Sequence, residues 1–330
     1  MKISFGLYGS GWRSEFFLRV ATALPERFEI VGVITRSDEK AERFNRTFGV
    51  KCYKTVDELL EVSKPLFMVV SVTASVNVDV PLNLLDQGIP VLLETPPATN
   101  LEMLARLRFI ETDKLGAIQH TQISFTHGYH AIALMRRFLG VGFENAEITA
   151  TKFPVSVVGG YTRNGEPTQE DILEKTQTIA VLNFNGKTGL LNFETDQHRS
   201  WVRSHIIQIK GERGELFNSN IKYLHDFKTP IESEFIRKDL GKEDNFEGFD
   251  LKGIIGDGQW FYRNPYQGSR LVDDEIAIAS CLDAMAEYVQ GGSPFYGLDE
   301  ASQDLYLSIL VDKAATFREH KGHFALHGIL

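Results

Sequence analysis

Apolar and polar positions alternate along the first hundred residues in two rhythms, short apolar runs and longer amphipathic segments. The apolar runs predict the buried strands of a parallel sheet, at residues 2–8, 28–35, 66–73 and 89–93. The amphipathic segments predict helices that cover this sheet, at residues 12–24, 38–49, 57–62, 77–87 and 100–113. Asp38 is expected to cap the second of these helices. The alternation predicts a doubly wound α/β domain over residues 1–117.

After about residue 117 the pattern changes to longer β-rich stretches. Strands are expected at residues 178–185, 189–195, 205–210 and 221–227. Asn185-Gly186 separates the first two and predicts a tight hairpin turn. Two helices follow, at 273–289 and 298–318, divided by a breaker at 291–294. Residues 118–330 are therefore predicted to form a substrate-binding and dimerisation domain of α+β type, with a large, mostly antiparallel sheet and final helices free to pack back on the first domain.

Composition narrows the functional classes. The chain has 330 residues, a hydrophobic fraction of 43% and a formal net charge of -9, which argue for a globular protein and against nucleic-acid binding as its task. The apolar runs are too short to cross a membrane, and a strand-like run from Lys2 leaves no room for a secretion signal. Cys52 and Cys281 are far apart and match no metal-binding or redox motif, so we expect a reducing cytoplasm and no metal.

Gly9, Ser10 and Gly11 follow the first strand and open the first helix. A tight turn at this place lets backbone N–H groups and the positive end of the helix meet a pyrophosphate. Ser14 takes the third glycine position of the Gly-x-Gly-x-x-Gly fingerprint and is small enough for close helix packing. The motif predicts a Rossmann dinucleotide-binding domain, whereas an ordinary turn between strand and helix is the alternative.

The end of the second predicted strand carries Thr35 and Arg36, where an NAD enzyme usually has an acidic residue for the ribose 2′-hydroxyl. No carboxylate repels a 2′-phosphate here, and a guanidinium is suited to bind one. The cofactor is therefore predicted as NADP or NAD, with NADP favoured. Arg36 lying flat over an adenine, or simply solvated, is the alternative.

Three segments carry a resemblance to a known family: GLYGSGWRSEFF from Gly6, VVSVTASVNVDVPLNLLDQGIPVLLETPP from Val69 and THGYHAIALMRRFLG from Thr126. Their order and spacing resemble the Gfo/Idh/MocA oxidoreductases over essentially the whole chain. The resemblance implies a set of cofactor-binding positions beyond those named above: Trp12, Arg13, Thr73, Ala74, Asn77, Glu94, Thr95 and Pro96.

The chain also departs from this family. Thr95 replaces the lysine of a Glu-Lys-Pro motif, and Thr126 and Ala133 replace acidic residues around Gly128. A threonine hydroxyl can orient a substrate, but it is too weak an acid for proton transfer near neutrality. A strand-and-helix unit of about 25 residues that the family has before the second domain also has no counterpart near Lys114. The connection is either shortened in this branch or incomplete in this sequence.

His130 keeps the position of the family's histidine and is the predicted general base, because an imidazole can take a hydroxyl proton near neutral pH. Thr95 is the second residue predicted at the reaction centre, where it would orient the substrate. Tyr129 can supply a phenolic hydrogen-bond donor. A structural or solvent-facing histidine is the alternative for His130, and packing is the alternative for Tyr129.

A dense polar segment, 196–201, ends a predicted strand of the second domain. Trp201 is suited to stack on a sugar ring, and His198 and Arg199 can bond its hydroxyl groups. These three residues are predicted substrate contacts. A sheet edge or a subunit interface explains such a cluster equally well.

The resemblance implies an NAD(P)-dependent oxidoreductase that moves hydride between a nicotinamide and a secondary alcohol of a sugar, cyclitol or related polyol. One alternative is a dinucleotide-binding sensor or partner subunit that has lost hydride transfer. Another is a non-redox enzyme that uses tightly bound NAD. Apolar residues on both faces of the predicted second sheet favour a homodimer, or a dimer of dimers, formed through that sheet.

Overall fold

The computed structural model describes residues 2–72, 79–94, 101–162, 165–239 and 250–316. The chain divides into two compact units, and each contains three chain segments. The first comprises residues 1–101, 237–253 and 263–295, and the second comprises 102–236, 254–262 and 296–330. Of the two final helices, α7 (Asp273–Val289) lies in the first unit and α8 (Leu298–Thr316) in the second.

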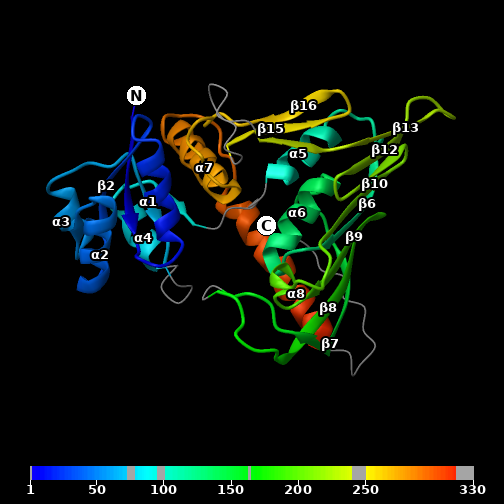
Figure 1. Cartoon of the computed structure of the whole chain (residues 1–330), viewed down its shortest axis with the longest axis horizontal. Coiled ribbons are helices and arrows are strands. Elements are labelled where there is room, and N and C mark those ends of the chain that lie inside the picture. The colour runs from blue at the N-terminus through cyan, green and yellow to red at the C-terminus, as the bar shows by residue number, and fades with distance from the viewer. Residues whose placement is uncertain (1, 73–78, 95–100, 163–164, 240–249, 317–330) are drawn as a thin grey trace. The chain divides into compact units, whose positions relative to one another are not determined.

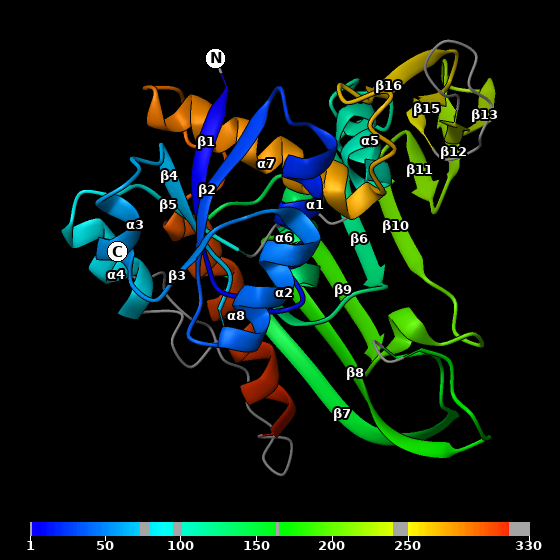
Figure 2. The ribbon, with the colours of Figure 1, turned by 60° about the vertical axis from the view of Figure 1, so that its left-hand side comes forward.

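The first unit is built on a parallel sheet with the strand order β3-β2-β1-β4-β5 (Figure 2). Its strands are β1 (Ile3–Tyr8), β2 (Phe28–Ile34), β3 (Cys52–Tyr53), β4 (Phe67–Val70) and β5 (Val91–Leu93). Its helices before α7 are α1 (Ser14–Ala23), α2 (Asp38–Phe48), α3 (Val56–Leu60) and α4 (Asp79–Asp86). Strand order and parallel pairing confirm the predicted Rossmann architecture.

Helices cover both faces of this sheet. Leu59 of α3 and Leu84 of α4 are fully buried in one apolar cluster with Met68 and Val70 of β4. α1 packs against α7, which also contacts β1 and β4. Burial on both faces explains why the strands read in sequence as continuous apolar runs.

Two details of this unit differ from the sequence expectation or extend it. Ser37, and not Asp38, caps α2: the Ser37 hydroxyl accepts the N–H of Lys40, and Asp38 begins the helix. A serine oxygen can fill the cap equally well, and the carboxylate one position later still favours the positive helix end. Among the described residues, none adds a sixth strand beside β5, because the next strand belongs to the other unit.

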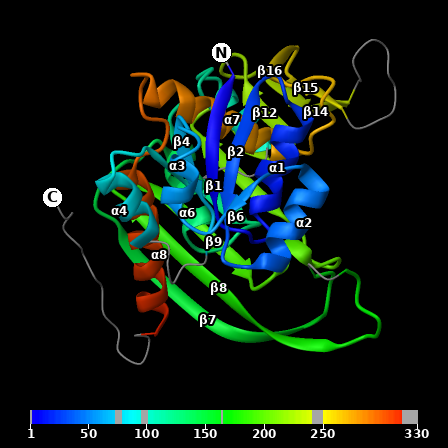
Figure 3. The same cartoon turned by 90° about the vertical axis from the view of Figure 1, so that its left-hand side faces the viewer.

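The second unit contains an eight-stranded sheet with the order β13-β12-β11-β10-β6-β9-β8-β7 (Figure 2), of which β6, β9, β8 and β7 are also labelled in Figure 3. Its strands are β6 (Ile118–Ser124), β7 (Glu147–Val158), β8 (Ile172–Phe184), β9 (Lys187–Glu194), β10 (Ile206–Gly211), β11 (Gly214–Phe217), β12 (Asn220–Leu224) and β13 (Pro230–Glu234). All neighbours pair antiparallel except β6 and β9. Asn185 and Gly186, both at positive φ, form the predicted β8–β9 turn.

Helices α6 (Gly128–Leu139) and α8 pack together on strands of this sheet (Figure 1). α5 (Leu101–Ile110) extends into the same unit, where Phe109 makes edge contacts with Tyr223, Phe235 and Phe261. A small sheet, β14-β15-β16, lies where the chain passes between the units. Its strands are β14 (Ile236–Asp239), β15 (Leu251–Gly256) and β16 (Gln259–Arg263).

A buried ion pair joins α6 to α8. Arg136 donates to the Asp304 carboxylate at 2.5 Å, and the two side chains are 3% and 1% exposed. Arg136 also donates to the Gly142 carbonyl at 2.7 Å, and Tyr296 donates to Asp304 at 2.6 Å.

None of the helices in the described segments is long and apolar enough to cross a membrane.

Replacing Asp304 by alanine is expected to lower the free energy of unfolding by about 3–5 kcal/mol, because Arg136 would keep a buried charge without this carboxylate. The matched control is Glu232→Ala, which removes the ion pair with Lys222 on the exposed sheet surface. This control should cost less than about 1 kcal/mol. Urea unfolding followed by circular dichroism measures both values, and equal losses would contradict the assigned role of the buried pair.

Candidate functional site

The turn after β1 is shaped by a close approach between two strand ends. Gly9 has φ of +122°, and a Cβ atom placed on it would lie 2.1 Å from the carbonyl oxygen of Ser71, just after β4. The Gly9 N–H donates to the Ile34 carbonyl at the end of β2. Only glycine fits this backbone, so the turn must leave β1 directly above the carboxyl ends of the central strands.

Gly11 lies in the opposite environment, because a Cβ placed on it would meet no atom within 4 Å. α1 begins three residues later without a side-chain cap on Arg13, while Ser14 is fully buried and lets the helix approach the sheet. The first N–H groups of α1, from Ser14 to Phe16, donate to the carbonyls of Gly11, Trp12 and Arg13, so the turn itself continues the helix. The positive end of the helix dipole therefore lies at the Gly11 turn, beside a backbone that carries no side chain. This open cradle fits a pyrophosphate. Trp12, at its rim, is 48% exposed.

Ser10 links this turn to the end of β2. The hydroxyl groups of Ser10 and Thr35 lie 2.7 Å apart, and the Thr35 oxygen also accepts the Ser37 N–H at 3.3 Å. Thr35 is buried, whereas Arg36 beside it is exposed. The hydroxyl pair fixes the loop that would hold the adenosine end of a dinucleotide.

One lysine, Lys54, lies beside Arg36 and is itself paired with a carboxylate. The Lys54 ammonium donates to the Arg36 carbonyl at 3.2 Å and pairs with Asp38, the first acidic residue after β2. Asp38 is thereby already bound to a lysine. The place where NAD enzymes have a free carboxylate instead carries a guanidinium and an ammonium, an arrangement compatible with a 2′-phosphate.

Arg13 connects Glu94, which follows β5, to the start of α7. Its guanidinium donates to Glu94 at 2.7 Å and to Asp274 at 3.2 Å. Burial raises the pKa of the neighbouring Cys281 thiol to about 11, an effect that Glu94 reinforces and Arg13 opposes. Cys281 is therefore a thiol near neutral pH and is unsuited to nucleophilic chemistry. Sequence reasoning did not reveal the Asp274 contact, because the two residues are distant along the chain.

The second unit places His130 in the first turn of α6. Its ring centroid lies 4.2 Å from that of Tyr129 and 5.6 Å from that of His127. Gly128, at φ of +52°, begins the helix, and His127 precedes it as the N-cap without a side-chain cap bond. Phe193 of β9 contacts the His127 ring at 6.0 Å. His130 thus lies in an aromatic group at a helix start.

His198 and Arg199 lie in a short 3₁₀ helix, η2 (Gln197–Arg199), that a glutamine fixes in place. The Gln197 amide donates to the carbonyls of Ser124 at 2.9 Å and Ser204 at 2.7 Å. These bonds pin the segment to the end of β6. Burial lowers the pKa of His198, with Arg199 adding to the effect.

Trp201 lies just beyond this helix and is 61% exposed. It makes no ring contact with the histidines among the described residues, so its predicted stacking on a substrate remains a prediction. His127 and His205 were not predicted as site residues. His127 borders the His130 motif, but no local signal in the sequence marks His205.

The structure brings the predicted residues together in two groups, one in each unit. The cofactor group in the first unit contains Gly9, Ser10, Gly11, Trp12, Arg13, Thr35, Arg36 and Glu94. The substrate group in the second contains Tyr129, His130, His198 and Arg199. Thr73, Ala74, Asn77, Thr95 and Pro96 lie outside the described residues. Across the described ranges, no group of three or more His, Cys, Asp or Glu side chains could hold a metal ion.

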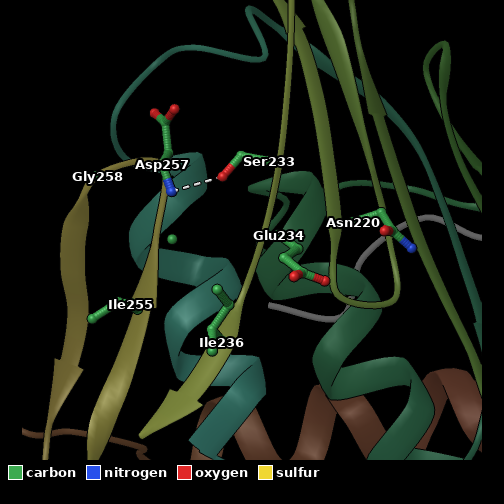
Figure 4. Close-up of a pocket in the computed structure, with 8 residues that line it drawn as sticks. Asn220, Ser233, Glu234, Ile236, Ile255, Asp257 and Gly258 are labelled. Carbon is green, nitrogen blue, oxygen red and sulfur yellow. Dashed lines mark hydrogen bonds between the residues drawn. The ribbon is translucent and has the colours of Figure 1, made fainter.

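A pocket of about 420 Å³ opens elsewhere in the second unit, between β13 and the β15–β16 turn (Figure 4). Asn220, Ser233 and Glu234 line it, and Ser233 accepts the Asp257 N–H at 2.9 Å. None of the predicted site residues lines this pocket. The Asp257 carboxylate is bound by Lys114 and by the Tyr223 hydroxyl, so it supports the turn.

Comparisons with known proteins agree with this geometry. Residues 3–119 match the Gfo/Idh/MocA model, described as an oxidoreductase family with an NAD-binding Rossmann fold, which confirms the resemblance seen in the sequence. No curated protein matches the chain in sequence.

Several solved structures share the fold over 100% of both chains. They include an NAD-binding oxidoreductase from Klebsiella pneumoniae (TM-score 0.66, 14% identity), levoglucosan dehydrogenase in complex with NADH (0.64, 13%) and a myo-inositol dehydrogenase from Corynebacterium glutamicum ATCC 13032 (0.63, 16%). At these identities the likeness establishes the fold.

Alanine variants of the two glycines in the turn test ligand binding and folding separately. Gly11→Ala should leave the melting temperature unchanged and weaken dinucleotide binding at least about 10-fold, because its methyl group enters the open cradle. Gly9→Ala should lower both stability and binding, because its methyl group meets the Ser71 carbonyl. Thermal unfolding and NADPH fluorescence titration measure the two effects. Unchanged binding in Gly11→Ala would show that the cradle holds no phosphate.

Proposed function

We propose, from the premise that residues 3–119 form the NAD-binding Rossmann domain of the Gfo/Idh/MocA oxidoreductases, that this chain is a dehydrogenase of polyols. It would move hydride between a nicotinamide dinucleotide and a secondary alcohol of a sugar, cyclitol or related polyol. The observation that carries the proposal is the open cradle at Gly11, facing the uncapped start of α1. Two structural relatives are named as dehydrogenases of levoglucosan and myo-inositol, which supports this substrate class.

The residues of the cofactor group have distinct roles in this proposal. The backbone of Gly9, Ser10 and Gly11 would bind the pyrophosphate, with Thr35 holding the Ser10 hydroxyl in place. Arg36 would bind the adenosine end, and its exposed guanidinium favours NADP over NAD. The bond from Arg13 would fix Glu94 at the end of β5, next to the segment that the family places beside the nicotinamide.

His130 would act as the general base. A bound nicotinamide supplies the hydride acceptor or donor. During alcohol oxidation, an unprotonated imidazole nitrogen of His130 takes the hydroxyl proton while the carbon of the same alcohol loses hydride, and the alcohol becomes a carbonyl. In the reverse direction the protonated imidazole returns that proton to the oxygen. Tyr129, in ring contact with His130, would orient the hydroxyl.

The central test is steady-state turnover with NADP and NAD over a panel of polyols and sugars. We expect tighter NADPH than NADH binding, turnover with at least one polyol, and a loss of about 10²- to 10⁴-fold in His130→Ala with NADPH affinity retained. His225→Ala, at an exposed position of the β12–β13 turn, is the control and should keep full activity.

Two other outcomes would overturn the proposed reaction. Tight NADPH binding without turnover of any polyol would favour the sensor or partner subunit, for which the replacement of the family's lysine by Thr95 is the motivating observation. Turnover without net oxidation, with NAD retained through purification, would favour the non-redox enzyme.

We also propose that a second copy of the chain covers part of the large sheet. The first strand pair, β7 and β8, carries partly exposed apolar side chains that the strand register places on one face: Phe153, Leu173 and Val181. Their exposed fractions range from 40% to 42%. An antiparallel sheet with such a face is stabilised when its copy covers it across a two-fold axis.

Light scattering at micromolar concentration is expected to give at least twice the 37.2 kDa mass of one chain. Val181→Asp should shift the protein towards the monomer, because a carboxylate would be buried in the apolar contact. Phe227→Asp is the control, since Phe227 lies outside this face and is 81% exposed. A monomeric wild-type chain, or equal behaviour of the two variants, would contradict the dimer.

A further inference from the structure

Four histidines from separate parts of the second unit are linked by ring contacts or by charge, and two of them, His127 and His198, contact the same phenylalanine, Phe193. His127 lies 5.6 Å from His130 and 6.0 Å from Phe193, measured between ring centroids. Phe193 also contacts His198, whose ring is almost parallel to it at 6.3 Å between centroids. The charges of His127 and His205 both affect the His198 imidazole. We call these four residues the histidine cluster.

The acidic groups near the histidine cluster are already paired. Glu194, 3% exposed, accepts from Arg203 at 3.0 Å. Asp196 accepts from Lys175 at 2.7 Å, a bond that is the main cause of the lowered pKa of this carboxyl. Arg199 forms no ion pair with a carboxylate in the part of the chain that the structure describes. The surroundings of the cluster therefore hold a surplus of positive charge.

The start of α6 adds to this surplus. His127 is its N-cap, and His130 lies in its first turn, which contains no acidic residue. The first N–H groups of a helix have no partner within the helix, and they favour a negative charge. Both basic residues of the last turn, Arg136 and Arg137, lie at the other end. Helix and histidines thus favour an anion at the same place.

Protonation of His198 makes anion binding at the histidine cluster depend on pH. Burial is the main cause of its lowered pKa, Arg199, His127 and His205 lower it further, and Asp196 opposes them. His198 is therefore mostly neutral at pH 7 in the free protein. A bound anion would raise its pKa again, so that binding takes up a proton and strengthens as pH falls. A neutral polyol would gain nothing from this coupling.

We propose that the substrate is an anionic sugar, which carries a carboxylate or a phosphate in addition to the hydroxyl that reacts. Arg199, His198 and the other histidines of the cluster bind this anionic group, while His130 acts on the reacting hydroxyl. This inference rests on the proposed function, because it names the substrate class of the same site. It goes beyond the neutral polyols considered above.

Calorimetry on the NADP-saturated full chain tests the inference with D-glucuronate, D-glucose 6-phosphate and D-glucose, at about pH 6 and pH 8. At least one anionic sugar is expected to bind about 10-fold more tightly than glucose at the lower pH and to lose most of this advantage at the higher pH. With D-glucuronate, whose carboxylate stays ionised over this pH range, the binding enthalpy should vary with the ionisation enthalpy of the buffer, which reports proton uptake by the protein. The tighter of the two anionic sugars identifies carboxylate or phosphate as the recognised group.

Variants of the proposed anion-binding residues, each with a matched control, show which residues bind the anionic group. Arg199→Gln and His198→Gln should each weaken anionic-sugar binding about 10-fold and weaken glucose binding much less, because the charge on the sugar is recognised in addition to its hydroxyl groups. Arg46→Gln and His225→Gln make the same changes at exposed positions, and they should have no effect. Equal affinities for glucose and both anionic sugars, or no binding of either anionic sugar at the lower pH, would overturn the inference.

Separate NADPH titration distinguishes this failure from failure of the proposed function. Dinucleotide binding and turnover of neutral polyols, without a preference for anionic sugars, would overturn the substrate inference alone. Preference for an anionic sugar in a chain that binds no dinucleotide would support the anion site and overturn the oxidoreductase.

Discussion

The first unit depends on how closely the ends of β1 and β4 approach each other. The carbonyl of Ser71 occupies the place that any side chain at position 9 would need, so the chain must pass Gly9 with a backbone that other residues rarely adopt. That passage directs the chain into α1 and leaves Gly11 facing open space. A steric constraint between two strands thus creates the cradle and aims an uncapped helix end at it.

Around the cradle, neutral contacts fix the backbone of the loop, and charged side chains lie on either side of it. Ser10 and Thr35 hold the loop through a hydroxyl pair, which leaves no net charge where a phosphate would lie. Arg13 is fixed by two carboxylates, whereas Arg36 lies exposed beside a lysine. The exposed guanidinium of Arg36 therefore lies where the adenosine end of a ligand would bind. The guanidinium of Arg13 is paired with carboxylates and connects Glu94 to α7.

In the second unit a glutamine has the corresponding structural role. Gln197 bonds the carbonyls of Ser124 and Ser204 and accepts the N–H of Glu194, so it joins β6, β9 and the segment before β10. This joint brings His198 towards the ring of Phe193, which His127 also contacts. An amide can satisfy three backbone groups without adding charge, which leaves the electrostatics of the site to the histidines and arginines.

The sequence alone determined the features that depend on local chemistry. Apolar periodicity defined the alternating strands and helices, Gly9 and Gly11 marked the turn after β1, and Asn185-Gly186 marked a hairpin, because each depends on backbone conformation or on burial of neighbouring positions.

The tertiary structure decided the contacts between distant residues. The pairing of Arg13 with Asp274, the placement of Phe109 among Tyr223, Phe235 and Phe261, and the approach of His205 to His198 depend on strand register and on which unit a helix joins. No local pattern encodes these choices, because the free energy of each contact arises only after both chain segments have been brought together by the packing of the core.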